Sequence, residues 1–411
     1  MTNWKPRFFI IWTGQALSLI GSALTQFVLI WWIVQTTNSP SALAIAGMMA
    51  LLPSALFSPI GGAIADRFNR RAVMIIADAI TAVCMLVLVF LFATDQVQLW
   101  QVYLLMFIRA TMQAFQQPAS AASAANLVPE DWLNRVAGMN QSLLGVMTIA
   151  AAPLGALALA FLPIQGALMI DVVTAVLGIT PLFFYAIPQP RASEHDNDFN
   201  LLTLWNDIRA GSKYVWQRPG LMWLYAIVGL VVLTIMPTFT LTPLLVRQHF
   251  NGGLNEVAFM EAFAGLGIIF GGIFISIWPL FKQRVVTLLV SFAVSCITVS
   301  FTALAPGNML WLATIWWTLS GFTFSTGNAP FVALLQSVVP NELQGRTFAL
   351  LNMVVGFAGP LGLVIAALLG EVVGVRGVFI TGGILSTLVC MIGLSSKTLR
   401  NVEMDTSQNP L

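Results

Sequence analysis

Four ionisable side chains lie inside long apolar stretches of the sequence, and they are the first candidates for chemistry. They are Asp78, Arg109, Asp171 and Glu261. Charged groups are costly inside a membrane, so they usually face a water-filled cavity or one another. Burial favours a protonated carboxyl group, whereas a nearby cation favours the carboxylate. An acid whose surroundings change between two conformations can therefore bind and release a proton, and we expect this of Glu261 and Asp171 first.

Asp78 is the third candidate proton carrier. It lies near one end of its apolar run, close to the arginines of the preceding turn. We favour a structural role for this residue, in which it neutralises a loop arginine or Arg109. Between Glu261 and Asp171 the sequence makes no choice.

Polar side chains recur at helical spacing around Arg109. Gln113, Gln116 and Gln117 follow it at four, seven and eight residues, which places them on one face of a helix. An earlier apolar run carries a similar stripe, made of Gln15, Ser18, Ser22 and Gln26. Hydrogen bonding between bundle helices would explain a single Ser or Gln of either stripe.

A short charged turn separates two of the apolar runs. Residues 61–71 read GGAIADRFNRR, so Asp66, Arg67, Arg70 and Arg71 follow a glycine pair that ends in Gly62. Only 8% of the chain is charged, and such a concentration of charge is typical of a turn at a membrane face. We expect Asp66 to need a partner and to act in a gate. Arg70 and Arg71 could simply follow the preference for basic residues in inner loops.

Composition identifies an all-α integral membrane protein. The mean hydropathy is +0.87 over 411 residues, and 58% of them are hydrophobic, far outside soluble-domain usage. Apolar runs long enough to cross a bilayer number twelve, near residues 8–34, 41–65, 72–93, 98–122, 138–161, 165–187, 221–246, 256–280, 285–305, 309–335, 348–370 and 376–396. The first run is not a cleavable signal, because no small-residue cleavage pattern follows it.

The loop charges predict the orientation of the chain. If the N-terminus is inside, only Arg247 and Arg376 fall in outer loops and Arg109 within a span, which leaves fifteen of the 18 basic residues on the inner side. Basic residues concentrate in cytoplasmic loops, so both termini are expected in the cytoplasm.

The chain divides near its middle. We expect a six-helix bundle over 1–187, a cytoplasmic linker over 188–220, a second six-helix bundle over 221–400 and a cytoplasmic tail over 401–411. The linker contains either an amphipathic helix lying on the membrane or an ordinary connecting loop. The two halves echo each other, since Pro129 and Arg135 are matched by Pro340 and Arg346, and the pair ending in Gly62 recurs at 271–272. Such echoes indicate a duplicated unit.

Residues 62–74 resemble the signature loop of the major facilitator superfamily. Gly62, Asp66, Arg67, Arg70 and Arg71 stand in register with it, whereas Ile64 replaces a Leu and Asn69 replaces a Gly that adopts a left-handed turn. Asn69 can still adopt that conformation. Within the superfamily, residues 12–18 and 107–110 resemble the macrolide-efflux branch, which is itself similar to siderophore exporters.

The resemblance implies two pseudo-symmetric six-helix bundles in the inner membrane of a bacterium. It implies that both polar stripes line a substrate cavity, although hydrogen bonding between bundle helices would explain a single Ser or Gln equally well. It also implies export of an amphipathic, drug-like compound in exchange for protons, by a monomer. Proline and glycine pairs at Pro153, Gly155, Pro360 and Gly362 would soften two corresponding spans. A siderophore or metabolite exporter is the nearest alternative. A receptor or lipid-handling protein on the same scaffold, which transports nothing, is the alternative from another class.

Other kinds of chemistry find no support in the sequence. There is no phosphate-binding G-x-x-x-x-G-K-[ST] loop, so uphill transport would need an ion gradient. His195 and His249 stand alone, and the three cysteines lie in apolar runs, so we expect no catalysis, cofactor, metal site or disulfide. A nucleic-acid partner is also not expected.

Overall fold

A computed structural model describes residues 4–185, 187, 209, 211–278, 280–281, 283–400 and 402. Its regular elements in these ranges are helices: α1 Trp4–Thr37, α2 Pro40–Arg67, α3 Arg70–Ala93, α4 Leu99–Leu127, η1 Glu130–Trp132, α5 Leu133–Phe161, α6 Ile164–Phe184, α8 Pro219–His249, α9 Leu254–Ile277, α10 Arg284–Leu304, α11 Leu310–Val338, α12 Asn341–Ser395 and α13 Lys397–Arg400. The predicted membrane helices are therefore present, each within a few residues of its expected bounds.

α12 contains two of the predicted spans in one helical run. Gly374 has a φ of +73° and a ψ of 167° inside it, which is not a helical conformation. A positive φ is accessible to glycine at little cost because it has no Cβ. The break divides α12 into two helices, so that the described ranges contain twelve long helices.

Most of these helices suit a bilayer by themselves. With α12 counted once, nine helices of the described ranges are long and apolar enough to cross a membrane by length and composition. α4 and α11 are long enough but not apolar enough to be counted among them. Arg109 and four glutamines lower the apolar content of α4, and serine, threonine and glycine lower that of α11.

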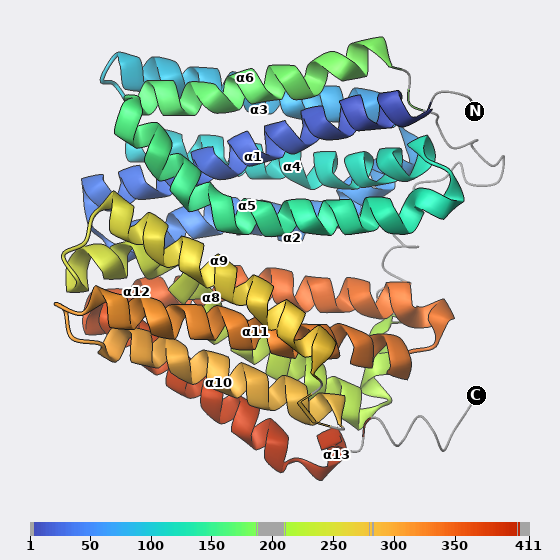
Figure 1. Cartoon of the computed structure of the whole chain (residues 1–411), viewed down its shortest axis with the longest axis vertical. Helices are drawn as coiled ribbons and strands as arrows, with labels where there is room; N and C mark the ends of the chain where they lie inside the picture. Colours follow the sequence, from blue (N-terminus) through green and yellow to red (C-terminus); the bar gives the residue numbers. More distant parts are fainter. Residues whose placement is uncertain are drawn as a thin grey trace. The chain divides into compact units, whose positions relative to one another are not determined.

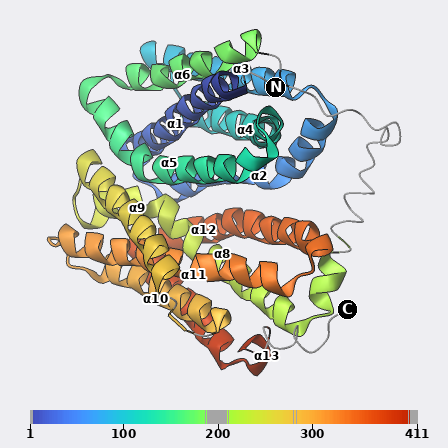
Figure 2. The same cartoon turned by 45° about the vertical axis from the view of Figure 1, so that its right-hand side comes forward.

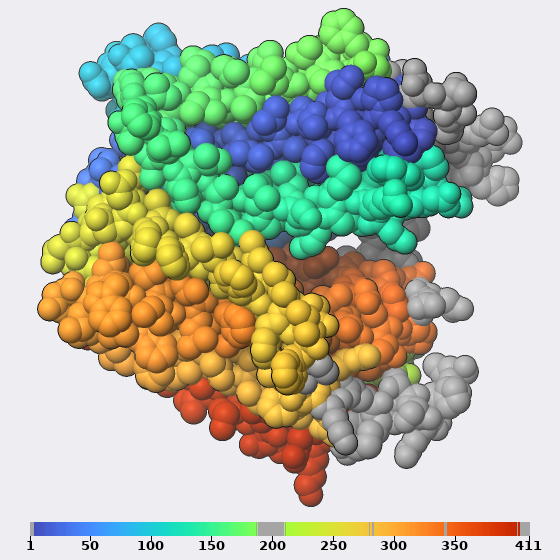
Figure 3. Space-filling view, in the orientation of Figure 1, coloured from blue at the N-terminus to red at the C-terminus, as the bar shows by residue number. Residues whose placement is uncertain are grey.

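The chain forms two compact units (Figures 1 and 2). Unit 1 comprises Met1–Thr37 and Ala46–Phe199, and unit 2 comprises Asn38–Ile45 and Asn200–Leu411. In unit 1, α1 packs against α5 and α6, and α3 packs against α4 and α6. In unit 2, α12 packs against α8 and α10, and α11 packs against α9 and α10. The space-filling view shows that side chains fill most of the space between neighbouring ribbons of each unit (Figure 3).

The turn between α2 and α3 places Asn69 at the start of α3. Its φ and ψ are −60° and 104°, so it is extended rather than left-handed, and its side-chain oxygen accepts a hydrogen bond from the Ala72 amide. Asn69 thus caps α3 and does not adopt the left-handed conformation that is open to asparagine. A capping asparagine offsets one unsatisfied amide of the first helical turn, which glycine cannot do. Most of the linker 188–220 and of the tail 401–411 lies outside the described residues.

Candidate functional site

Arg109 and Asp171 form a buried ion pair in the middle of unit 1. Arg109 Nε on α4 lies 3.8 Å from Asp171 Oδ2 on α6, and their side chains are 8% and 1% exposed. The Ser22 hydroxyl on α1 donates to Asp171 Oδ1 at 2.9 Å. Arg109 also donates to the Ser22 carbonyl oxygen and to Gln26 Oε1. One cation therefore connects α1, α4 and α6.

Asp78 belongs to a separate chain of hydrogen bonds. Gln116 Nε2 on α4 donates to Gln15 Oε1 on α1 at 2.5 Å, and Gln15 Nε2 donates to Asp78 Oδ2 on α3 at 3.2 Å. Gln15 Nε2 also donates to the Gly178 carbonyl oxygen at 3.0 Å. These side chains are buried, and such a chain fixes the orientation of each amide because every partner is committed.

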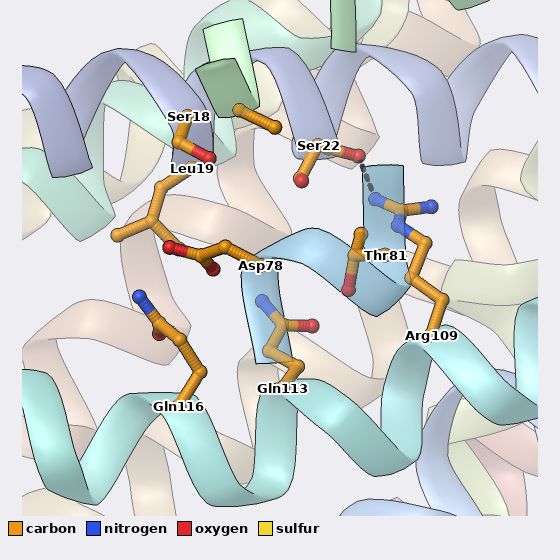
Figure 4. A pocket seen from close by; sticks show the side chains of 9 residues that line it. Ser18, Leu19, Ser22, Asp78, Thr81, Arg109, Gln113 and Gln116 are labelled. Atoms are coloured by element: carbon orange, nitrogen blue, oxygen red, sulfur yellow. Dashed lines mark hydrogen bonds between the residues drawn. The ribbon is translucent and has the colours of Figure 1, made fainter. Parts of the chain in front are cut away.

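A small cavity lies between the ion pair and this chain (Figure 4). Its volume is about 20 Å³, which is room for one water molecule. It is lined by Ser18, Leu19, Ser22, Asp78, Thr81, Arg109, Gln113, Gln116 and Ala175. In Figure 4 the side chains of Asp78, Thr81 and Gln113 point into the space between α1 and α4. The two stripes expected on α1 and α4 thus meet at this cavity.

The sequence placed some residues of this site well and missed others. Gln113 lines the cavity, Gln26 contacts Arg109, and Gln116 is central to the hydrogen-bond chain. Gln117 is exposed and does not line this cavity, although it shares the stripe. Thr81 was missed, and its spacing of three residues from Asp78, one helical turn away, was the available signal.

Glu261 belongs to unit 2 and stands apart from this cluster. It is half-buried on α9, and the Trp317 indole of α11 lies beside its carboxyl group. Trp317 is 1% exposed, and its Nε1 closes no hydrogen bond with another group of the described ranges. Glu261 is thus near a polar ring nitrogen rather than near a cation.

In the signature turn, the acidic side chain of Asp66 is exposed and the basic side chain of Arg70 is buried. The Asp66 side chain is 75% exposed and lies 3.5 Å from Arg70 Nη2. Arg70 is buried and donates to the carbonyl oxygens of Ala65 and Ala122, which ties the end of α2 to α4. Asp66 thus has a partner in Arg70 of the same turn, while most of its side chain stays exposed at the end of α2.

The other basic residues of the turn differ in their surroundings. Arg71 Nη2 donates to the Phe183 carbonyl oxygen at 2.9 Å, which ties the start of α3 to the end of α6. Arg67 is exposed in the last turn of α2.

The glycines of the expected hinges are packing contacts. A Cβ on Gly155 of α5 would lie 2.5 Å from Phe27 Cδ1 and 3.4 Å from the Leu24 carbonyl oxygen of α1. A Cβ on Gly362 of α12 would lie 2.0 Å from the Leu233 carbonyl oxygen of α8. Pro153 and Pro360 lie inside these continuous helices. Each glycine therefore lets one helix approach the first long helix of its own unit.

No group of three or more His, Cys, Asp or Glu residues among those that the structure describes could hold a metal ion. Cys84, Cys296 and Cys390 are buried free thiols.

A bundle of membrane-length helices with charged groups buried inside defines the class as multi-pass membrane proteins with a polar site in their interior. Comparison with known proteins agrees, because the profile of the Major Facilitator Superfamily matches residues 11–299 and 279–407. The chain belongs to this superfamily and is a multi-pass membrane transporter, not an enzyme.

Two relatives and one solved structure illustrate the similarity. The chain is 28% identical to macrolide efflux protein A of Streptococcus pyogenes over 98% of both chains. It is 25% identical to the multidrug efflux pump Tap of Mycolicibacterium fortuitum over 100% of both chains. The structure of the nucleoside transporter NupG superposes with a TM-score of 0.73 at 12% identity, over 96% of this chain and 99% of that one. At this identity the structural likeness concerns the fold alone.

Proposed function

We propose that the protein exports amphipathic, drug-like compounds, macrolides among them, in exchange for protons by alternating access. The observation that carries this proposal is the buried cluster of Arg109, Asp171 and Asp78 inside a membrane bundle. Two acids around one cation form a site whose charge changes by one when a proton binds. Similarity to macrolide efflux protein A over the whole chain supports the direction of transport and the substrate class.

A siderophore exporter fits the described residues less well. Acidic or metal-binding cargo would need cationic groups with free donors inside the membrane, and Arg109 is already committed to Asp171, Ser22 and Gln26. A largely apolar molecule needs few polar anchors.

The proposal also covers the location of the protein in the cell and the residues that take part in its conformational change. We place the protein in the inner membrane of a bacterium as a monomer, with both termini in the cytoplasm, because basic residues concentrate in loops on that side. We assign Asp66 to the gate at the inner end of α2, and we assign a softening role to Pro153 and Pro360. Glu261, Asp171 and Asp78 are the candidate proton carriers.

The test uses the purified protein in liposomes with an imposed pH gradient. Proton movement is recorded while erythromycin, a lipophilic cation or a siderophore is added. We expect proton flux that depends on the macrolide or the lipophilic cation, and loss of that flux in Glu261→Gln or Asp171→Asn. Asp95→Asn, which changes an exposed acid, is the matched control. Ligand binding without proton flux would contradict antiport and favour a receptor, and flux driven only by the siderophore would favour the alternative exporter.

A further inference from the structure

A second cavity lies beside the first in unit 1, toward the end of the bundle where α1 and α3 begin and α4 ends. Its volume is about 40 Å³, room for two or three water molecules. Its polar lining consists of Trp12, Gln15, Ser120, Ser123 and Asn140. The side chain of Gln15 borders this cavity and also donates to Asp78, which lines the first one. Gln15 therefore stands between the two cavities.

The second cavity extends to Trp12 on α1 and Asn140 on α5. Trp12 Nε1 donates to Asn140 Oδ1 at 2.8 Å, and both residues are half-buried. Deeper walls of the same cavity are apolar, since Phe8, Ile11 and Leu127 are buried there. Polar side chains thus form a continuous path from Asp78 through Gln15 to the Trp12–Asn140 hydrogen bond. Apolar side chains line the other walls of the second cavity.

The two acids of the cluster differ in what protonation would disturb. Asp171 faces Arg109, so its protonation would remove the counterion of a buried guanidinium group. Asp78 has no cation within 4.0 Å among the described residues, and it accepts a hydrogen bond from an amide, Gln15 Nε2. Protonating Asp78 therefore breaks no ion pair.

The net charge of the buried cluster also favours Asp78 as the group that binds a proton. The charged groups near Asp78 are Arg109 from α4, which lines the same cavity, and Asp171 from α6. Cys84 of α3 lies near Arg109, and its thiol is neutral. Two carboxylates therefore accompany one guanidinium group, and a single added proton brings the buried cluster to zero net charge. Uncompensated charge is costly in such surroundings.

We propose, building on proton-coupled transport, that Asp78 is the proton-binding group of unit 1 and that the two cavities joined by Gln15 form its route to the end where α3 begins. In the binding step a hydronium ion in the first cavity gives a proton to a carboxylate oxygen of Asp78 and leaves as water. The Gln15 and Gln116 amides keep their own protons, because they position Asp78 and its water and do not titrate. The Trp12–Asn140 hydrogen bond is the mouth of this route.

Infrared spectroscopy of the purified full-length protein tests the site without a transport assay. A pH titration should reveal the carbonyl stretch of a buried protonated carboxyl group, which is lost in Asp78→Asn and kept in Asp95→Asn. In Asp171→Asn the band should remain but appear at lower pH, because Asp78 and Arg109 alone already sum to zero charge. If Asp78→Asn fails to fold, Asp78→Glu should shift the band. A band that persists unshifted in the Asp78 variants, a band lost only in Asp171→Asn, or no titrating band at all would overturn the proposal.

The route is tested by the rate of hydrogen–deuterium exchange at the same band. After transfer to heavy water, Asn140→Leu should slow the downshift of the band by about tenfold, the effect of about one missing hydrogen bond on a barrier. Gln117→Leu, an exposed amide on α4, should leave the rate unchanged. Equal rates in both variants would overturn the route. Absence of proton flux in liposomes would contradict antiport instead, and it would leave the infrared result intact.

Discussion

The Arg109–Asp171 pair makes a residue-scale prediction about stability and binding. Arg109→Ala leaves Asp171 buried without its cation, which costs about 3–5 kcal/mol in the free energy of unfolding. We expect this variant to lose ligand binding as well, because Gln26 and the Ser22 carbonyl group lose their donor. Thermal unfolding in detergent measures the first effect and equilibrium binding of a macrolide the second.

The matched control is the double variant Arg109→Ala with Asp171→Asn, which removes both charges. It should regain most of the lost stability because the amide needs no cation, while binding stays impaired. A double variant as unstable as Arg109→Ala alone would show that the two side chains are not coupled.

A second residue-scale prediction separates Asp66 from Arg70. Asp66→Asn should change the free energy of unfolding by less than about 1 kcal/mol, because the pair is largely exposed on the acid side. Arg70→Ala should destabilise unit 1 by about 1–3 kcal/mol, since buried carbonyl groups of Ala65 and Ala122 lose their donor. Unfolding curves of the two variants provide the comparison.

The gate assigned to Asp66 predicts a distinct functional loss. Asp66→Asn should slow macrolide efflux from cells or liposomes and leave macrolide binding unchanged. Arg67→Gln, a change of one charge at the next position, is the control for loss of charge at this end of α2. Efflux at the wild-type rate in Asp66→Asn would remove this residue from the gate.

At the scale of elements, the glycine pairs show how the two halves repeat. A Cβ on Gly61 would lie 2.2 Å from the Ala114 carbonyl oxygen of α4, and a Cβ on Gly271 would lie 2.1 Å from the Phe322 carbonyl oxygen of α11. Nothing lies within 4 Å of a Cβ on Gly62. The first glycine of each pair therefore sets a helix–helix approach.

This difference predicts opposite effects at neighbouring positions. Gly61→Ala should lower the free energy of unfolding by about 1–3 kcal/mol, because the new methyl group meets backbone rather than a flexible side chain. Gly62→Ala should be neutral or stabilising by up to about 1 kcal/mol, because alanine favours the helix. Thermal unfolding of both variants in one detergent provides the measurement. Equal midpoints would contradict the packing argument.

The bounds of the helices were predictable from the sequence. Which helices and residues pack against one another was only partly predictable. Apolar run length fixed the long helices to within a few residues, since a bilayer demands about 20 apolar residues of each. Nothing in local sequence distinguishes Gly61 from Gly62, or Gln116 from Gln117, because the difference lies in which neighbouring helix each one meets. Gln15 and Asp78 are 63 positions apart, and only the packing of α1 on the other helices brings them together.

The structure of Asn69 illustrates a different limit. The resemblance to a glycine-containing loop left a left-handed turn open, but the asparagine side chain offers a capping bond that glycine lacks. That local hydrogen bond favours an extended residue at the start of α3. A family pattern thus predicted the turn but not its backbone conformation.

At the scale of the whole molecule, the distribution of charge predicts the orientation in the membrane. Phe68 follows α2 at the end that carries Asp66 and the arginines, and Asp95 follows α3 at its other end. Both are exposed. Because three native thiols are buried, a membrane-impermeant thiol reagent should label intact wild-type cells little, which allows single introduced cysteines to be compared.

We expect Asp95→Cys to be labelled in intact cells and Phe68→Cys to be labelled only after the membrane is opened. The reason is that the turn at 66–71 carries four of the chain's charged residues, three of them basic, and such loops stay in the cytoplasm. The same reagent applied to inside-out vesicles should reverse the pattern. Labelling of Phe68→Cys in intact cells would place the charged turn outside. It would also move the mouth of the proton route at Asn140 to the outer side, because α5 begins at the same end of unit 1 as α3.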